Sequence, residues 1–112
     1  MDNISDNHNY QSPFDEIDLT SPLQLLAKWV DEAKELALPE PDAMNLATVD
    51  EDGNPHNRMV LMRHINDTEI GFFTNLKSNK AHDIFSSGKT SSTLWWPQLG
   101  RQVRVEGSAR EM

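Results

Sequence analysis

The chain has 112 residues, a formal net charge of −8 and no cysteine. This length allows one small domain that burial against a partner would help to stabilise, and the lack of cysteine excludes disulfides and thiolate metal sites. The negative charge disfavours nucleic acid as a partner, because such binding draws most of its affinity from cations that neutralise phosphates.

Residues 1–20 are polar and acidic, with Asp, Asn and Ser throughout. Such a segment buries too little apolar surface to offset its ordering entropy, so we expect a disordered tail, or one that lies over a partner, before a domain over residues 21–112. The tail lacks the apolar core of a signal peptide, and no run approaches the roughly 18 apolar residues of a membrane span. We therefore expect a cytoplasmic protein with no membrane partner.

A helix is predicted to begin after Ser21. Ser21, Pro22 and Gln24 have the order of an N-cap, a first-turn proline and the partner residue of a capping box. An apolar stripe follows at helical spacing and consists of Leu23, Leu26, Trp29, Val30, Ala33 and Leu36. We expect the helix to end before Pro39 and its stripe to pack in the core.

The first predicted hairpin joins residues 44–49 to residues 57–65. The turn between them contains Gly53, which can supply a positive φ. Arg58 and Arg63 lie five positions apart in the second strand, and an odd separation places two side chains on opposite faces of a regular strand. One arginine therefore faces a partner, or the strand bulges.

The remaining elements are a strand over residues 69–74, a short helix from the cap Ser78 to Gly88, and a hairpin of residues 90–96 with residues 102–111. Five strands with mostly antiparallel connections favour a mainly β (α+β) fold, a small antiparallel barrel. A parallel nucleotide-binding sheet has no support, because the chain has no G-x-G-x-x-G or Walker motif.

The second half of the chain carries the chemistry expected of an anion site. Residues 1–52 hold 13 acidic and 2 basic side chains, whereas residues 53–112 hold 5 acidic and 8 basic ones. The start of the helix at Ser78 offers unpaired N–H groups and the positive end of the helix dipole to a phosphate. Scattered bases such as Lys77 and Lys89 are more simply explained as solvated surface.

Four segments resemble, in order and spacing, the amino-terminal half of the pyridoxine/pyridoxamine 5'-phosphate oxidase family. They are Arg58-Met59-Val60-Leu61-Met62-Arg63, Phe72-Phe73-Thr74-Asn75, Ser78-Asn79-Lys80-Ala81-His82 and Arg101-Gln102-Val103-Arg104-Val105-Glu106-Gly107. The resemblance implies a split barrel that forms a homodimer with FMN at the interface. It also implies oxidation of pyridoxine or pyridoxamine 5'-phosphate to pyridoxal 5'-phosphate, with O₂ as acceptor and H₂O₂ as product.

The cofactor-binding residues that the resemblance implies are Arg58, Met59, Val60, Leu61, Met62, Arg63, Phe73, Thr74, Ser78, Asn79, Lys80 and Gln102. Arg58 stands where a family arginine contacts the flavin phosphate, and Gln102 where a glutamine reaches the flavin. Arg63 replaces the usual Lys and is also the implied contact to the substrate phosphate, with a planar fork instead of a point charge. Asn79 stands where the family has Arg, and Phe73 where it has Tyr.

Other chemically notable residues are expected to be structural. The four histidines show no close ligand spacing, so we predict no metal site, and no residue is predicted to be a catalytic base. Of Trp95 and Trp96, one indole is expected in the core or at a dimer interface. Two alternatives stay open, which are a flavin-binding split barrel without this oxidase activity and a cofactor-free interaction domain.

Overall fold

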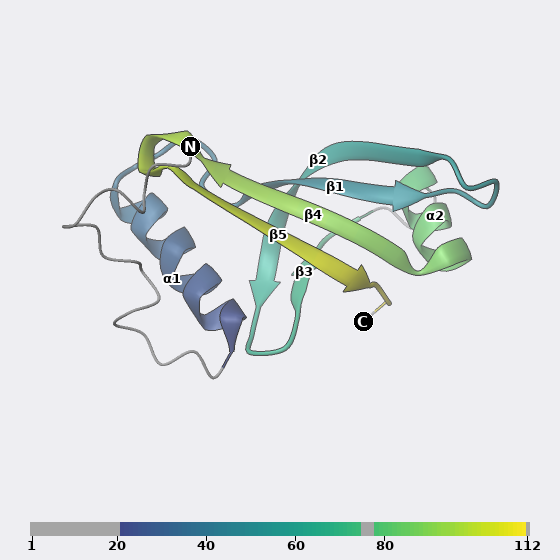
Figure 1. Cartoon of the computed structure of the whole chain (residues 1–112), viewed down its shortest axis with the longest axis horizontal. Helices are drawn as coiled ribbons and strands as arrows, with labels where there is room; N and C mark the ends of the chain where they lie inside the picture. Colours follow the sequence, from purple (N-terminus) through teal and green to yellow (C-terminus); the bar gives the residue numbers. More distant parts are fainter. Residues whose placement is uncertain (1–20, 75–77, 112) are drawn as a thin grey trace, which may run out of the picture.

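The computed structural model describes residues 21–74 and 78–111, so the predicted tail lies outside the described residues. Its elements are α1 (Pro22–Glu35), β1 (Ala43–Val49), β2 (Pro55–Ile65), β3 (Ile70–Phe72), α2 (Asn79–Ser87), β4 (Lys89–Trp96), the 3₁₀-helix η2 (Pro97–Leu99) and β5 (Arg101–Ser108). Figure 1 shows α1 and α2 at opposite ends of one long, curled sheet.

The five strands form one antiparallel sheet in the order β3-β2-β1-β4-β5. The long strand β2 pairs with β1 along its first part and with β3 at its end. The register with β3 shifts between Met62 and His64, where β2 turns from one neighbour to the other (Figure 1). A bulge of this kind bends a strand. The curled half-barrel that results confirms the predicted mainly β, antiparallel split-barrel fold.

Two predicted strand ends and one predicted member of the apolar stripe are wrong. β3 ends at Phe72, because the following residue, Phe73, has left the sheet and is 84% exposed. The last strand ends at Ser108, and the N–H of Ala109 makes one further bond in the same register, to the carbonyl of Gly88, where α2 ends. Leu36 does not belong to the buried stripe of α1, because it is the C-cap of the helix and is 58% exposed.

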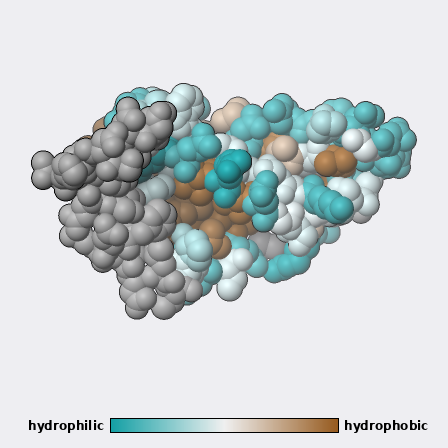
Figure 2. Space-filling model, in the orientation of Figure 1, coloured by the Kyte–Doolittle hydropathy of each residue, from teal (hydrophilic) through white to brown (hydrophobic). Residues whose placement is uncertain are grey.

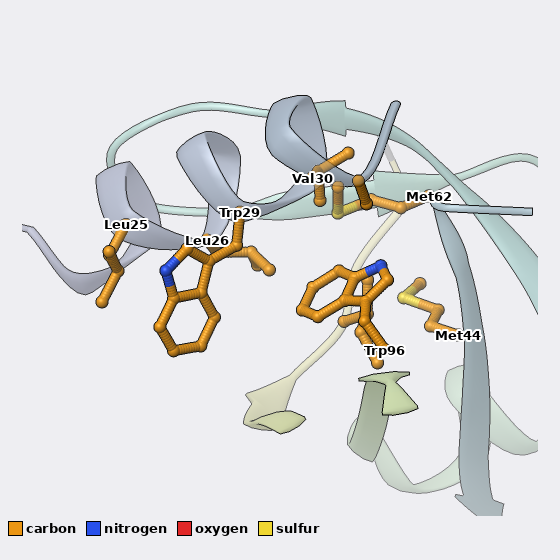
Figure 3. Close-up of a cluster of buried hydrophobic side chains, with 9 residues drawn as sticks. Leu25, Leu26, Trp29, Val30, Met44, Met62 and Trp96 are labelled. Atoms are coloured by element: carbon orange, nitrogen blue, oxygen red, sulfur yellow. The ribbon is translucent and has the colours of Figure 1, made fainter. Parts of the chain in front are cut away.

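The core lies between α1 and the inner face of the sheet, as Figure 3 shows. Its buried members are Leu25, Leu26, Trp29, Val30, Ala33, Met44, Met62, Leu94 and Trp96. The rings of Trp29 and Trp96 meet edge to face with centroids 6.4 Å apart, and Trp96 Nε1 donates to the carbonyl of Pro41 at 2.8 Å. Trp96 is therefore the predicted core indole, whereas Trp95 is 65% exposed on the outer face.

The surface is uneven in hydropathy. Figure 2 shows that the hydrophobic surface of the face in view gathers between α1 and the strands, while the end that carries the β1–β2 turn is mostly hydrophilic. No helix in the described part of the chain is long and apolar enough to cross a membrane.

The β1–β2 turn is organised by Asp50. Its Oδ1 accepts the backbone N–H groups of Asp52 and Asn54 at 3.0 and 2.8 Å, and its Oδ2 lies 2.9 Å from Nε2 of His56. The hydrogen bond from His56 and then that from Asn54 lower the pKa of Asp50 from 3.8 to about 2. Gly53 adopts φ 87°, which confirms the positive φ predicted for this turn.

Replacing Asp50 by Asn is expected to destabilise the protein at neutral pH more than in acid. The folded-state pKa lies below the usual value, so the contribution of the carboxylate is present above about pH 4 and is lost as pH falls through about 2. Urea unfolding of the wild type and Asp50→Asn across this range measures the difference. Asp52→Asn in the same exposed turn is the control, and a stability gap that stays constant with pH would contradict the assignment.

Candidate functional site

The short helix α2 lies against the inner face of β1. Ser78 begins it by accepting the N–H of Ala81 on its Oγ at 3.3 Å, and Gly88 ends it with φ 69°, as the sequence predicts. Ala81 and Ile84 are buried, which fixes the helix against the sheet. Its positive dipole end therefore has a fixed place beside the strands.

Arg58 on β2 reaches this helix through Thr48 on β1. Its Nη1 donates to the carbonyl of Leu46 at 3.1 Å and to Oγ1 of Thr48 at 2.9 Å. The hydroxyl of Thr48 in turn donates to Oδ2 of Asp83 on α2 at 2.9 Å, and Nη2 of Arg58 lies 4.0 Å from the same oxygen. Three elements thus meet in one polar cluster, which we define as Arg58, Thr48 and Asp83.

The cluster is stable because its buried groups satisfy one another. Thr48 and Asp83 are only 1% and 4% exposed, and an unpaired carboxylate at such a site would be costly. The side chain of Arg58 keeps 25% of its surface exposed. Arg58 therefore lies between the buried carboxylate and the solvent, beside the part of α2 that carries Asp83.

Arg63 lies in the β2 bulge, which resolves the two alternatives left by its spacing from Arg58 in favour of a bulge. Its side chain is 46% exposed, and its Nη1 donates to Oδ2 of Asp42 at 3.2 Å. A ligand at Arg63 would therefore either bind beside Asp42 or replace the hydrogen bond between Arg63 and Asp42. It lies outside the cluster of Arg58, Thr48 and Asp83.

The four residues between the two arginines alternate between the faces of the sheet. Val60 packs against the core and Met62 is buried in it, whereas Met59 and Leu61 are exposed. The side chains of Val60 and Met62 thus cannot contact a cofactor without disturbing the core, and any contact from these two residues would come from their backbone.

The other predicted site residues divide into two places. Thr74 is near the start of α2, where its Oγ1 lies 3.3 Å from Oγ of Ser78. Gln102 is exposed on β5 opposite the exposed Trp95, on the outer face. Phe73 is exposed beyond the end of β3. The backbones of Asn79 and Lys80 open α2, but their side chains lie outside what the structure describes.

Arg58 and Gln102 consequently lie on opposite faces of the sheet within one chain. Arg58 points inward, because it contacts the buried residues Thr48 and Asp83. Gln102 points outward, because its partner in the register is Trp95, whereas the neighbours of Trp95 in β4 are both buried. A single molecule placed on the inner face could not reach both side chains.

The arrangement at α2 is suited to an anion. A fixed guanidinium and the start of a helix both favour negative charge, and both are features of phosphate-binding sites. An open surface pocket of about 270 Å³ lies elsewhere, lined by Leu23, Gln24, Ala27, Ile65, Asn66 and Asp67. None of the predicted site residues lines it. Among the described residues, no group of His, Asp or Glu side chains could hold a metal ion.

Sequence reasoning did not identify Thr48 and Asp83. Thr48 alternates in phase with the buried residues Met44 and Leu46, which suggests an inward side chain but not its partner. Asp83 stands between Ala81 and Ile84, both on the buried side of α2. An acid on the buried side of a helix is an unusual placement that requires a partner, and this was the available signal.

Comparison with known proteins gives a consistent result. The family model described as "Pyridoxamine 5'-phosphate oxidase" matches residues 30–112. The chain is 45% identical over 91 residues to a pyridoxine/pyridoxamine 5'-phosphate oxidase of Cupriavidus taiwanensis, and 39% identical over 107 residues to that of Mannheimia succiniciproducens. These matches cover 81% and 96% of the chain but 43% and 51% of the relatives, so the chain spans about half of their length.

Two solved structures have a similar fold. PhzG from Burkholderia lata, solved in complex with tetrahydrophenazine-1-carboxylic acid, matches with a TM-score of 0.80 and 29% identity over 89% of this chain and 50% of its own. A Nostoc punctiforme protein described as a pyridoxamine 5'-phosphate oxidase-related, FMN binding protein matches with a TM-score of 0.67 over 88% of this chain and 47% of its own. At 22% identity, the second match concerns the fold alone.

Proposed function

Because the chain belongs to the pyridoxamine 5'-phosphate oxidase family, we propose that it binds FMN and oxidises pyridoxine or pyridoxamine 5'-phosphate to pyridoxal 5'-phosphate. O₂ is the acceptor and H₂O₂ the second product. The observation that carries the proposal is the partly exposed guanidinium of Arg58, fixed beside the α2 helix by Thr48. Such an arrangement recognises a phosphate, which FMN has and riboflavin lacks.

The residues around α2 fit the phosphate end of FMN. Both hydrogens of Arg58 Nη1 are used within the protein, while Nε and Nη2 make no hydrogen bond to a described residue. Two donors on a planar guanidinium can bind a phosphate bidentately. In this proposal the start of α2, with Ser78 and Lys80, adds N–H groups and positive potential from the same helix that carries Asp83.

The protein's part in the reaction is to bind and orient. A bound flavin supplies the hydride-accepting chemistry, so no side chain has to act as the redox group. Arg58 and the start of α2 hold the cofactor phosphate, and Arg63 binds the substrate phosphate from the bulge of β2. Arg63 is half-exposed in the bulge and lies outside the cluster of Arg58, which supports assigning the two phosphates to separate places.

The proposal includes a homodimer with FMN at the interface. Three large apolar side chains, Met59, Leu61 and Trp95, are exposed on the outer face, and their burial against a second copy would support a dimer. A second copy on this face explains how Gln102, which points away from Arg58, contacts the flavin, since it would reach the cofactor held by the other subunit. A monomer in sedimentation equilibrium at all concentrations, with FMN present, would contradict the dimer.

Titration of the purified chain with FMN, with riboflavin as the control that lacks the phosphate, tests the proposal. Quenching of flavin fluorescence is expected to saturate with FMN and to be much weaker with riboflavin. Incubation of the FMN-bound protein with pyridoxamine 5'-phosphate in air should then yield pyridoxal 5'-phosphate and peroxide. Binding without turnover would favour a flavin-binding protein without this activity, and no binding would favour the cofactor-free interaction domain.

A further inference from the structure

Thr48 occupies a place that neither the sequence motifs nor the proposed reaction accounts for. It is buried, and its hydroxyl lies 2.9 Å both from Nη1 of Arg58 and from Oδ2 of Asp83. The carboxylate can only accept a hydrogen bond, so the single hydroxyl hydrogen of Thr48 goes to Asp83. The oxygen of Thr48 is therefore left as an acceptor aimed at Arg58.

We propose that Thr48, oriented by Asp83, is a positioning residue that sets the guanidinium of Arg58 for binding the phosphate of FMN. The inference rests on the proposed function and deepens it. Thr48 does not touch the cofactor in this account. It acts through Arg58, and its effect is specific to the phosphate.

The first argument concerns the donors of Arg58. Nη1 has two hydrogens, and the carbonyl of Leu46 and the hydroxyl of Thr48 accept them. Two acceptors on one nitrogen fix the plane of the rigid guanidinium, which a single contact would leave free to rotate. The fixed plane leaves Nε and Nη2 for the phosphate, and their orientation is set before the ligand arrives.

The second argument concerns Asp83. Nη2 of Arg58 lies 4.0 Å from Oδ2 of Asp83, which is beyond a hydrogen bond, whereas the hydroxyl of Thr48 lies between the two groups and bonds both. Without the hydroxyl, the buried carboxylate would lack its donor and would draw Nη2 from a 4.0 Å ion pair into a hydrogen-bonded one. The donors that the phosphate needs would then be used within the protein. Thr48 thus keeps Asp83 satisfied and Nη2 available.

The matched variants are Thr48→Val, which keeps the shape but removes the hydroxyl, and Thr48→Ser, which keeps the hydroxyl. Fluorescence titration of the full chain with FMN and with riboflavin gives the preference for the phosphate. Thr48→Val is expected to lower FMN affinity about tenfold, as for one charge-assisted hydrogen bond, with riboflavin affinity unchanged. Thr48→Ser should retain the wild-type preference. If Thr48→Val shows no cooperative melting transition, Thr48→Ala is measured in its place.

A double-mutant cycle separates positioning from a general structural role. In the Arg58→Ala background, the hydroxyl of Thr48 has no guanidinium to orient, so Thr48→Val should cause no further loss of FMN affinity. The same loss in both backgrounds would overturn the inference, as would an unchanged FMN preference in Thr48→Val alone. In both cases the proposed function would stand. A wild-type chain that does not prefer FMN to riboflavin would overturn the proposed function and this inference together.

Discussion

Replacing Arg58 by alanine is expected to weaken FMN binding about tenfold to a hundredfold while leaving riboflavin binding almost unchanged. The range corresponds to about 1.5 to 3 kcal/mol, the contribution of one charge-assisted hydrogen bond, and is the smallest loss expected when both donors are removed. The donors that we expect to bind the phosphate are Nε and Nη2, because Nη1 is engaged with Leu46 and Thr48. The measurement is the ratio of the two dissociation constants in fluorescence titrations of the same preparation.

The control for Arg58→Ala is Lys89→Ala. Lys89 is exposed at the start of β4, and its replacement removes the same charge from the protein. Arg58→Ala also leaves the buried carboxylate of Asp83 without its nearest cation, so both variants are compared well below their melting temperatures. Equal losses of FMN affinity in the two variants would show that net charge, not the site at α2, accounts for the effect.

Leu26→Ala is expected to lower the free energy of unfolding by about 2 to 5 kcal/mol, the range for a large cavity in a packed core. Leu26 is only 2% exposed and lies in the cluster with Trp29 and Trp96. Small domains are stabilised by only about 5 to 15 kcal/mol, so this loss is a large share of the total. Urea unfolding followed by circular dichroism measures it.

Leu36→Ala is the matched control, since it makes the same substitution at the end of the same helix. Leu36 is 58% exposed and leaves no cavity when shortened, so a change within about 0.5 kcal/mol is expected. Comparable losses for the two leucines would contradict the placement of the core on one side of α1. The pair also tests the correction that the structure makes to the predicted apolar stripe.

Local signals account for what the sequence predicted correctly. Ser21, Ser78 and Gly88 limit the two helices as expected, and Gly53 makes the turn of the first hairpin. Caps and turns depend on residues a few positions apart, so they can be predicted from the local sequence. The predicted ends of β3 and β5 are wrong, because a strand ends where its neighbour stops pairing. That neighbour cannot be identified from the residues next to the strand end.

The candidate site also combines features that local sequence predicts with features that depend on the fold. Residue type and local spacing were enough to predict a cation and a helix start for a phosphate, because both depend on residues close together in the chain. The folded structure was needed to show that Arg58 and Gln102 face opposite sides of the sheet, and that Arg58 is held by Thr48 and Asp83. Thr48 and Asp83 are 35 positions apart, and their contact depends on strand register and helix docking, which no local pattern specifies.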